Sequence, residues 1–283
     1  MASSSLCIAD WLAGAKTRLA AVTEEADTEA KYCLCHLLAC SSSYLYAYPE
    51  QPLTTEQLSQ LDAYLAQRLT GRPLAYVLGR WHFWDFELAV SEATLIPRAD
   101  TEVVVEQALK LALPADAKVL DLGSGTGAIA LALARERPDW QVLGLDIQPD
   151  AVQCANGNAS TLQLANCRFM ASNWFDAVPA QSFELIVSNP PYIEPEDPHL
   201  VLGDLRYEPQ TALVAGREGL ADIEHIVQNS WQYLAAGGWL VLEHGYQQAD
   251  AVRHCLQQAG FVAVRSQKDY GGNWRISLGQ RPS

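Results

Sequence analysis

The stretch VLDLGSGTGAIALALA, residues 119–134, decides the fold, because it carries a strand pattern directly into a helix pattern. Gly123, Gly125 and Gly127 stand at the transition, where glycine permits a tight turn and lets a ligand approach the backbone closely. The G-x-G-x-G spacing is one residue shorter than the dinucleotide-binding pattern, and no Lys-Ser or Lys-Thr pair follows, as a phosphate-binding loop requires. The turn alone therefore leaves two interpretations open, a ligand site and a tight turn without one.

Strand and helix patterns alternate on both sides of this stretch, from Thr101 to the end of the chain. The predicted strands are AKVLDLG (117–123), WQVLGLDI (140–147), CRFMAS (167–172), FELIVSN (183–189), GGWLVLEHG (237–245), FVAVRSQ (261–267) and NWRISLG (273–279). Such alternation predicts an α/β, doubly wound, mostly parallel sheet of seven strands with helices on both faces. The last two strands have little between them, which predicts an antiparallel edge.

The N-terminal part has a different pattern, with apolar residues at helical spacing in 8–21, 27–40 and 54–70. Asp27 and Thr54 are plausible N-caps, and Gln57 completes a capping box with Thr54. We predict a small helical-bundle domain over 1–75, a connector over 76–98 and the α/β domain over 99–283. Within the connector, FELAV (86–90) and ATLIP (93–97) predict a short β-hairpin.

The composition excludes several classes of protein. The 283 residues carry a formal net charge of −14, which argues against a protein that depends on non-specific duplex binding. No apolar stretch is long enough to cross a membrane, and the N-terminus shows no secretory signal. Seven cysteines without a disulfide framework favour a reducing cytoplasm. Cys33, His36 and Cys40 share a helical face, but with no fourth ligand nearby we expect a packed core and no metal.

Asp146 ends the strand that follows the glycine turn. A carboxylate there can accept two hydrogen bonds from a ribose diol, as in other doubly wound nucleoside sites. The alternative is an N-cap of the helix that begins near Pro149. A nucleoside site without phosphate-binding residues favours S-adenosyl-L-methionine over NAD or ATP.

The strand 183–188 should lie beside the glycine strand and ends in Asn189-Pro190-Pro191-Tyr192. Asn189 offers one acceptor and two donors, the prolines leave carbonyls outside any ladder, and Tyr192 supplies a flat ring. This combination suits a planar –NH2 group, whose nitrogen can be held in line with a methyl donor. The alternative is a proline-stiffened loop without a ligand.

Together, DLGSGTG (121–127), Asp146 and Asn189-Pro190-Pro191-Tyr192 resemble the class I S-adenosylmethionine-dependent methyltransferases that modify planar amino groups. Nearly the whole chain resembles one branch, the HemK family of peptide chain release factor glutamine methyltransferases. The resemblance rests on the helical N-terminal domain and on an ordered series of motifs: GRPLAYVLGRWHFWDFELAV (71–90), TLIPRADTE (94–102), SNWFDA (172–177), SNPPYI (188–193), YEPQTALVAGREGL (207–220) and LEHG (242–245). Ala99 replaces the proline that the family more commonly has in RPDTE.

The resemblance implies a cytoplasmic enzyme that transfers a methyl group from S-adenosyl-L-methionine to the glutamine of the Gly-Gly-Gln motif in release factors. It implies that the cofactor is bound by Gly123, Ser124, Gly125, Thr126, Gly127, Asp146, Trp174 and Asn189. Asn189, Pro190, Pro191 and Tyr192 are implied to hold the glutamine, with Asn189, Pro190 and Tyr192 as the catalytic residues. We expect a monomer whose helical domain docks the release factor and which binds no nucleic acid.

Two residues keep two interpretations each. Arg98, with Leu95 to its N-terminal side, either lines the glutamine pocket or forms an ion pair at the domain junction. Glu243 either shapes the site or pairs between domains, and His244 has no assigned role. Three rival functions remain: an adenine-N6 DNA methyltransferase, which needs a target-recognition domain and a basic surface; a ribosomal protein glutamine methyltransferase, which has the same chemistry; and a silent binding module on the same fold.

Overall fold

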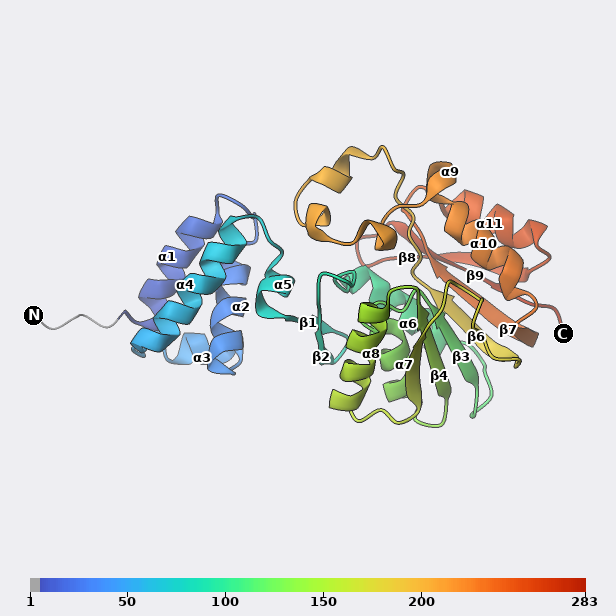
Figure 1. The fold of residues 1–283 in the computed structure, drawn as a ribbon, viewed down its shortest axis with the longest axis horizontal. Coiled ribbons are helices and arrows are strands. Elements are labelled where there is room, and N and C mark those ends of the chain that lie inside the picture. The colour runs from blue at the N-terminus through green and yellow to red at the C-terminus, as the bar shows by residue number, and fades with distance from the viewer. Residues whose placement is uncertain (1–5) are drawn as a thin grey trace, which may run out of the picture. The chain divides into compact units, whose positions relative to one another are not determined.

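The computed structural model describes residues 6–283 and divides into two compact units (Figure 1). One unit contains the residues up to Gly79 together with Val201–Tyr207, and the other contains Arg80–Leu200 and Glu208–Ser283. The expectation that the N-terminus has no secretory signal falls partly on residues 1–5, which lie outside the described residues. Within 6–283, no helix has the length and apolar character needed to cross a membrane.

The first unit is helical, with α1 (Ile8–Leu19), α2 (Ala26–Leu38), α3 (Ser42–Ala47), α4 (Thr55–Leu69) and α5 (Leu74–Leu78). Its core is formed by apolar side chains one helical turn apart, such as Leu61 and Leu65 of α4. Thr54 caps α4 in a capping box with Gln57, as the sequence predicts. The prediction for Asp27 is wrong: α2 begins one residue earlier, so Asp27 lies in the first turn, where it binds Lys31.

The segment Val201–Tyr207, far away in sequence, is attached to this helical unit. The Tyr207 hydroxyl donates to the carbonyl of Thr70 over 2.7 Å, and the Asp204 carboxylate lies 3.4 Å from the Arg68 guanidinium. Arg68 is buried and also binds Glu29 at 2.7 Å, so its charge is compensated from two sides. The helical unit is therefore completed by a loop that leaves the α/β unit and returns to it.

The connector contains a β-hairpin, but its strand at 86–89 pairs with a different segment from the predicted one. Strand β1 (Arg80–Phe83) pairs with β2 (Phe86–Ala89) across a turn at Trp84, whose φ is +57°, and ATLIP forms no strand. The outer edge of β2 is occupied by a side chain: Asn158 accepts from the Ala89 N–H at 2.8 Å and donates to its carbonyl at 3.1 Å. The chain after β2 forms no further strand up to residue 98, and it lines the site described below.

The second unit is built on a seven-stranded sheet in the order β5-β4-β3-β6-β7-β9-β8. Its strands are β3 (Lys118–Leu122), β4 (Gln141–Asp146), β5 (Cys167–Ala171), β6 (Phe183–Ser188), β7 (Leu234–Glu243), β8 (Val262–Lys268) and β9 (Trp274–Gln280). The first five run parallel, which confirms the mostly parallel sheet. The last two form the expected antiparallel hairpin, but β9 inserts between β7 and β8, so the antiparallel strand lies inside the sheet.

Helices cover both faces of this sheet (Figure 1). One face packs on α6 (Glu102–Leu109), α7 (Ala128–Glu136) and α8 (Pro149–Thr161), and the other on α10 (Ala221–Ser230) and α11 (Ala249–Gln258). Val119 and Leu120 are neighbours in β3 yet belong to the two different cores, because successive strand residues point to opposite faces. Three short helical turns complete the unit: η1 (Ala99–Thr101), η4 (Gln210–Ala212) and α9 (Gly216–Gly219). The turn η2 (Pro198–Val201) ends at the first residue of the segment assigned to the helical unit, and η3 (Leu205–Tyr207) belongs to that unit.

Candidate active site

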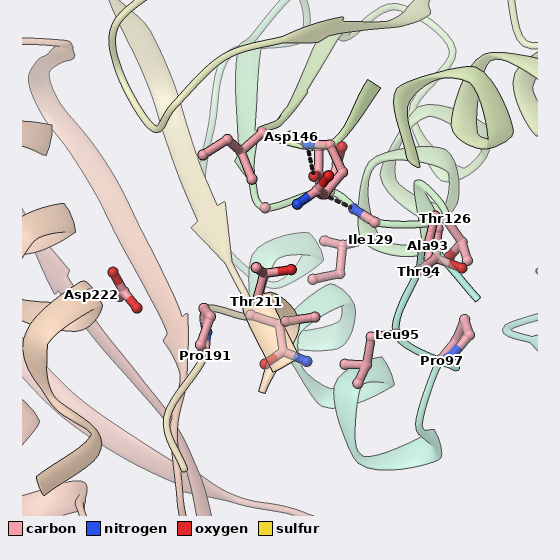
Figure 2. A pocket seen from close by; sticks show the side chains of 18 of the residues that line it. Ala93, Thr94, Leu95, Pro97, Thr126, Ile129, Asp146, Pro191, Thr211 and Asp222 are labelled. Atoms are coloured by element: carbon pink, nitrogen blue, oxygen red, sulfur yellow. Dashed lines mark hydrogen bonds between the residues drawn. The ribbon is translucent and has the colours of Figure 1, made fainter. Parts of the chain in front are cut away.

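A pocket of about 340 Å³ opens at the carboxyl ends of β3, β4 and β6, a size typical of small-molecule sites (Figure 2). Parallel strands in register bring their carboxyl ends to one edge, and there Ser188 Oγ donates to the Leu122 carbonyl over 2.7 Å. The residues around the pocket come from six segments: Ala93, Thr94, Leu95, Pro97 and Thr101; Gly123–Thr126, Ala128 and Ile129; Asp146, Ile147 and Gln148; Ser172, Asn173 and Trp174; Asn189 and Pro191; Thr211, Ala212, Val214 and Asp222.

The glycine turn forms one wall of this pocket. Gly123, Gly125 and Gly127 all have positive φ, of 70°, 53° and 84°, a region that disfavours residues with a Cβ. Gly127 is the N-cap of α7 and packs so tightly that a Cβ there would lie 2.7 Å from the Phe169 ring. Gly123 to Thr126 line the pocket, and Gly127 is not among the lining residues.

The Asp146 carboxylate bridges the turn and the next helix. Its Oδ2 accepts from the Gly125 N–H at 2.8 Å and its Oδ1 from the Gln148 N–H at 2.9 Å, as the dashed lines in Figure 2 show. Burial raises the pKa of Asp146, and the backbone hydrogen bonds act in the opposite direction. The N-cap of α8 is Gln148, so Asp146 lies before the helix, with one edge towards the pocket.

The Asn-Pro-Pro-Tyr segment contributes two of its four residues to the pocket surface, Asn189 and Pro191. Asn189 Nδ2 donates to Thr101 Oγ1 over 3.2 Å, which anchors the amide. Tyr192 packs against the core, with its hydroxyl donating to Glu243 at 3.3 Å and its carbonyl accepting from Gln248 at 3.2 Å. The resemblance implies Pro190 and Tyr192 at the substrate, and neither is among the residues that line the pocket.

Trp174 and Asp222 line the side of the pocket nearest α10. Trp174 has a φ of +46°, and its ring lies 3.6 Å from the position that a Cβ of Gly123 would take. Asp222 stands in the first turn of α10 (Figure 2), and burial raises its pKa while His225 and Trp174 act to lower it. An aromatic plane and two carboxylates, those of Asp146 and Asp222, therefore face one cavity.

The connector segment closes the opposite side, with Leu95 and Pro97 turned towards the pocket in Figure 2. Glu208, whose side chain is fully buried, accepts from the Ile96 N–H over 3.0 Å and forms an ion pair with Arg98. Both partners belong to the α/β unit. Arg98 thus helps to hold the pocket wall, and the sequence left Glu208 without a role.

Comparison with curated proteins identifies relatives along almost the full chain. The release factor glutamine methyltransferase of Escherichia coli K12 is 48% identical over 270 residues, which cover 95% of this chain and 97% of that protein. The enzyme of the same name from Aliivibrio fischeri is 46% identical over 259 residues, 91% of each. The chain belongs to the release factor glutamine methyltransferase family.

Two domain families match separate parts of this family member. The PrmC N-terminal domain matches residues 10–79, and the methyltransferase small domain matches 100–205. Among solved structures, a methyltransferase from Pyrococcus furiosus aligns with a TM-score of 0.55 and 17% identity over 77% of this chain and 98% of that one. This likeness shows the methyltransferase fold, and the family assignment rests on the sequence relatives.

Sequence reasoning missed seven polar residues of the family member's pocket: Thr94, Thr101, Gln148, Ser172, Asn173, Thr211 and Asp222. Thr101 lies in a motif that was noted, and its hydroxyl partner becomes visible only in the structure. Asp222 occupies the first turn of a helix, where an acidic residue is common for electrostatic reasons, so its type and position gave no separate signal.

Proposed function

We propose that this protein transfers a methyl group from S-adenosyl-L-methionine to the side-chain amide nitrogen of the glutamine in the Gly-Gly-Gln motif of peptide chain release factors. The observation that carries the proposal is the convergence of the glycine turn, Asp146 and Asn189 on one pocket. The family membership supports the same activity.

The pocket fits a nucleoside that carries a positive charge and no phosphate. Among the described residues that line it, none is Lys or Arg, whereas Asp146 and Asp222 supply two carboxylates. Ser124 Oγ is buried and makes no hydrogen bond to another described residue, so it is available to a ligand. We assign the ribose to Asp146, the adenine to Trp174 and the methionine part to the turn Gly123–Gly127.

S-adenosyl-L-methionine, when bound, supplies an electrophilic methyl group on a sulfonium. The task of this chain is to hold the glutamine nitrogen in line with it, because an amide nitrogen is a poor nucleophile. We assign Asn189 Oδ1 and the carbonyl of Pro190 as acceptors for the two amide hydrogens, and Tyr192 to the amide plane. Acceptors on both hydrogens favour positive charge on nitrogen in the transition state, and the proton leaves after transfer without a strong base.

The pocket walls indicate how a glutamine is admitted. Leu95, Pro97 and Pro191 line the pocket with apolar side chains (Figure 2). A methylene chain packs on such walls, whereas an extruded adenine base needs a phosphate-neutralising surface nearby, which the net charge of −14 disfavours. We therefore assign the pocket to a protein side chain and the helical unit to release factor docking.

The test uses radiolabelled S-adenosyl-L-methionine with purified release factor, either intact or with its Gly-Gly-Gln glutamine replaced by alanine. Duplex DNA and ribosomal protein serve as parallel acceptors. We expect label only on the intact factor, and loss of label with a folded Asn189→Ala enzyme. Label on DNA, or equal label on both forms of the factor, would overturn the assignment.

A further inference from the structure

Three motifs that lie far apart in sequence meet at one wall of the pocket, where Thr101 and Asn189 line it. Thr101 comes from η1, Asn189 follows β6, and Glu243 ends β7. Asn189 Nδ2 donates to Thr101 Oγ1 over 3.2 Å, and the Thr101 side chain also faces the Glu243 carboxyl, whose pKa it lowers. Thr101 is 4% exposed and Glu243 is 1% exposed, so both side chains are shielded from water.

The chemistry of the three groups gives the chain of hydrogen bonds a direction. A side-chain –NH2 only donates, so Thr101 Oγ1 must accept from Asn189 and direct its own hydrogen elsewhere. Glu243 Oε1 already accepts from the Tyr192 hydroxyl, whereas the buried Oε2 makes no hydrogen bond to a described residue. Because an ionised carboxylate only accepts, Oε2 is an acceptor that remains open to the Thr101 hydrogen.

We propose that Glu243 is a positioning residue that, through Thr101, determines which end of the Asn189 amide faces the pocket. With an acceptor at position 243, Asn189 Nδ2 is held by Thr101 and Oδ1 is left for the –NH2 of the substrate. With a donor at 243, the Thr101 hydroxyl turns to donate to Asn189 Oδ1. Asn189 then presents its own –NH2 to that of the substrate, and two –NH2 groups form no hydrogen bond.

This inference rests on the proposed function and adds a pH dependence to it. Burial raises the pKa of Glu243 to about 7, against the Thr101, Tyr192 and Arg275 side chains, which lower it, while Asp100 raises it further. Above this pH the carboxylate accepts and Asn189 is oriented for substrate. As the pH falls through about 7, Glu243 gains a proton and becomes a donor, so the rate falls.

The test is a double-mutant cycle of Glu243→Gln and Thr101→Val, with kcat and KM measured on the intact release factor. Glu243→Gln keeps the shape but adds a donor, and we expect kcat to fall roughly 100-fold, as for loss of one transition-state hydrogen bond. Affinity for S-adenosylhomocysteine, measured by calorimetry, should remain. In the Thr101→Val background the same substitution should have no further effect, because the connection is gone. Thr101→Ser, which keeps the hydroxyl, should retain activity.

Between pH 6 and pH 8 the wild-type kcat should rise, and that of Glu243→Gln should be flat. Full activity of Glu243→Gln, or losses that multiply across the cycle, would overturn the proposal while leaving the function intact. If Glu243→Gln unfolds, equal activity of Thr101→Val and Thr101→Ser overturns it instead. A wild-type enzyme that labels no release factor would overturn the function itself, so the two failures are separable.

Discussion

The backbone N–H of Gly125 donates to Asp146 Oδ2 over 2.8 Å, so the carboxylate at the end of β4 holds the turn at the end of β3. A carboxylate has about four acceptor sites, and here the N–H groups of Gly125 and Gln148 use two of them, while the Ile147 backbone also interacts with the carboxylate. The remaining sites are available to the hydroxyls of a ribose. One side chain therefore builds the pocket and, in the proposed function, also binds the ribose.

Asp146→Ala should weaken binding of S-adenosylhomocysteine by roughly 10- to 100-fold, the equivalent of one or two hydrogen bonds to a charged group. Isothermal titration calorimetry measures this directly. Asp150→Ala is the matched control, because Asp150 is exposed in the first turn of α8 and lies outside the pocket. Equal affinity of the two variants would contradict the role of Asp146.

Gly144→Ala should lower the free energy of unfolding by about 1–3 kcal/mol, because it overpacks the sheet face. A Cβ at Gly144 would lie 2.2 Å from the Phe169 ring, which is itself buried. Gly157→Ala, in the exposed part of α8 with open space around it, should instead raise that free energy by about 0.5–1 kcal/mol. Denaturant titration measures both, and changes of the same sign would refute the packing argument.

His244 should make the fold less stable in acid. It is fully buried, its Nδ1 lies 2.9 Å from the Gly245 carbonyl, and its Nε2 lies 2.8 Å from Ser277 Oγ. Burial lowers its pKa from 6.5 to about 4. As the pH falls through 6.5, His244 is protonated in the unfolded chain but stays neutral in the folded protein. Up to about 3 kcal/mol of the free energy of unfolding is therefore lost by pH 4.

The raised pKa of Glu243 has the opposite effect, because it makes the folded state more stable as the pH falls. The contribution of His244 is therefore measured as a difference between the wild type and a variant. Unfolding free energies of the wild type and of His244→Gln should diverge between pH 7 and pH 4, with the variant losing less. His254→Gln is the control, because His254 is exposed on α11. Parallel curves for wild type and His244→Gln would show that the imidazole takes up its proton equally in both states.

Glu208→Ala should raise the KM for release factor about tenfold, as expected for one lost hydrogen bond that holds the pocket wall. The variant removes the acceptor for both the Ile96 N–H and Arg98. Glu208→Gln keeps an oxygen that can accept from the Ile96 N–H, so its KM should lie between those of the wild type and Glu208→Ala. Glu196→Ala, on an exposed loop, serves as the control in the same steady-state assay, and a KM equal to wild type in Glu208→Ala would exclude the role.

Local sequence was sufficient where the deciding interactions are local. The strand-to-helix transition at Gly123–Gly127, the end of β4 at Asp146 and the capping box at Thr54 all depend on neighbours within one turn or one strand. Periodicity then predicted the sheet and the helices on both of its faces, because apolar spacing reports burial directly. The series of motifs predicted the family.

Prediction was wrong where a distant residue selects between local options. FELAV is a strand, but its partner is RWHF, because the Asn158 side chain from α8 occupies the other edge. No strand order was predicted for the last two strands: β9 enters between β7 and β8, an order that the succession of strands along the chain does not reveal.

The sequence by itself determined that an α/β methyltransferase fold carries a glycine turn, a strand-ending carboxylate and an Asn-Pro-Pro-Tyr corner. Only the tertiary structure decided that Thr101 holds the Nδ2 end of Asn189, since Thr101 belongs to η1 and Asn189 follows β6. It also decided that Glu208 supports the wall at Ile96. A hydrogen bond between segments distant in the chain forms only when folding brings the two side chains together. The spacing of residues in the sequence does not show which distant residues will meet.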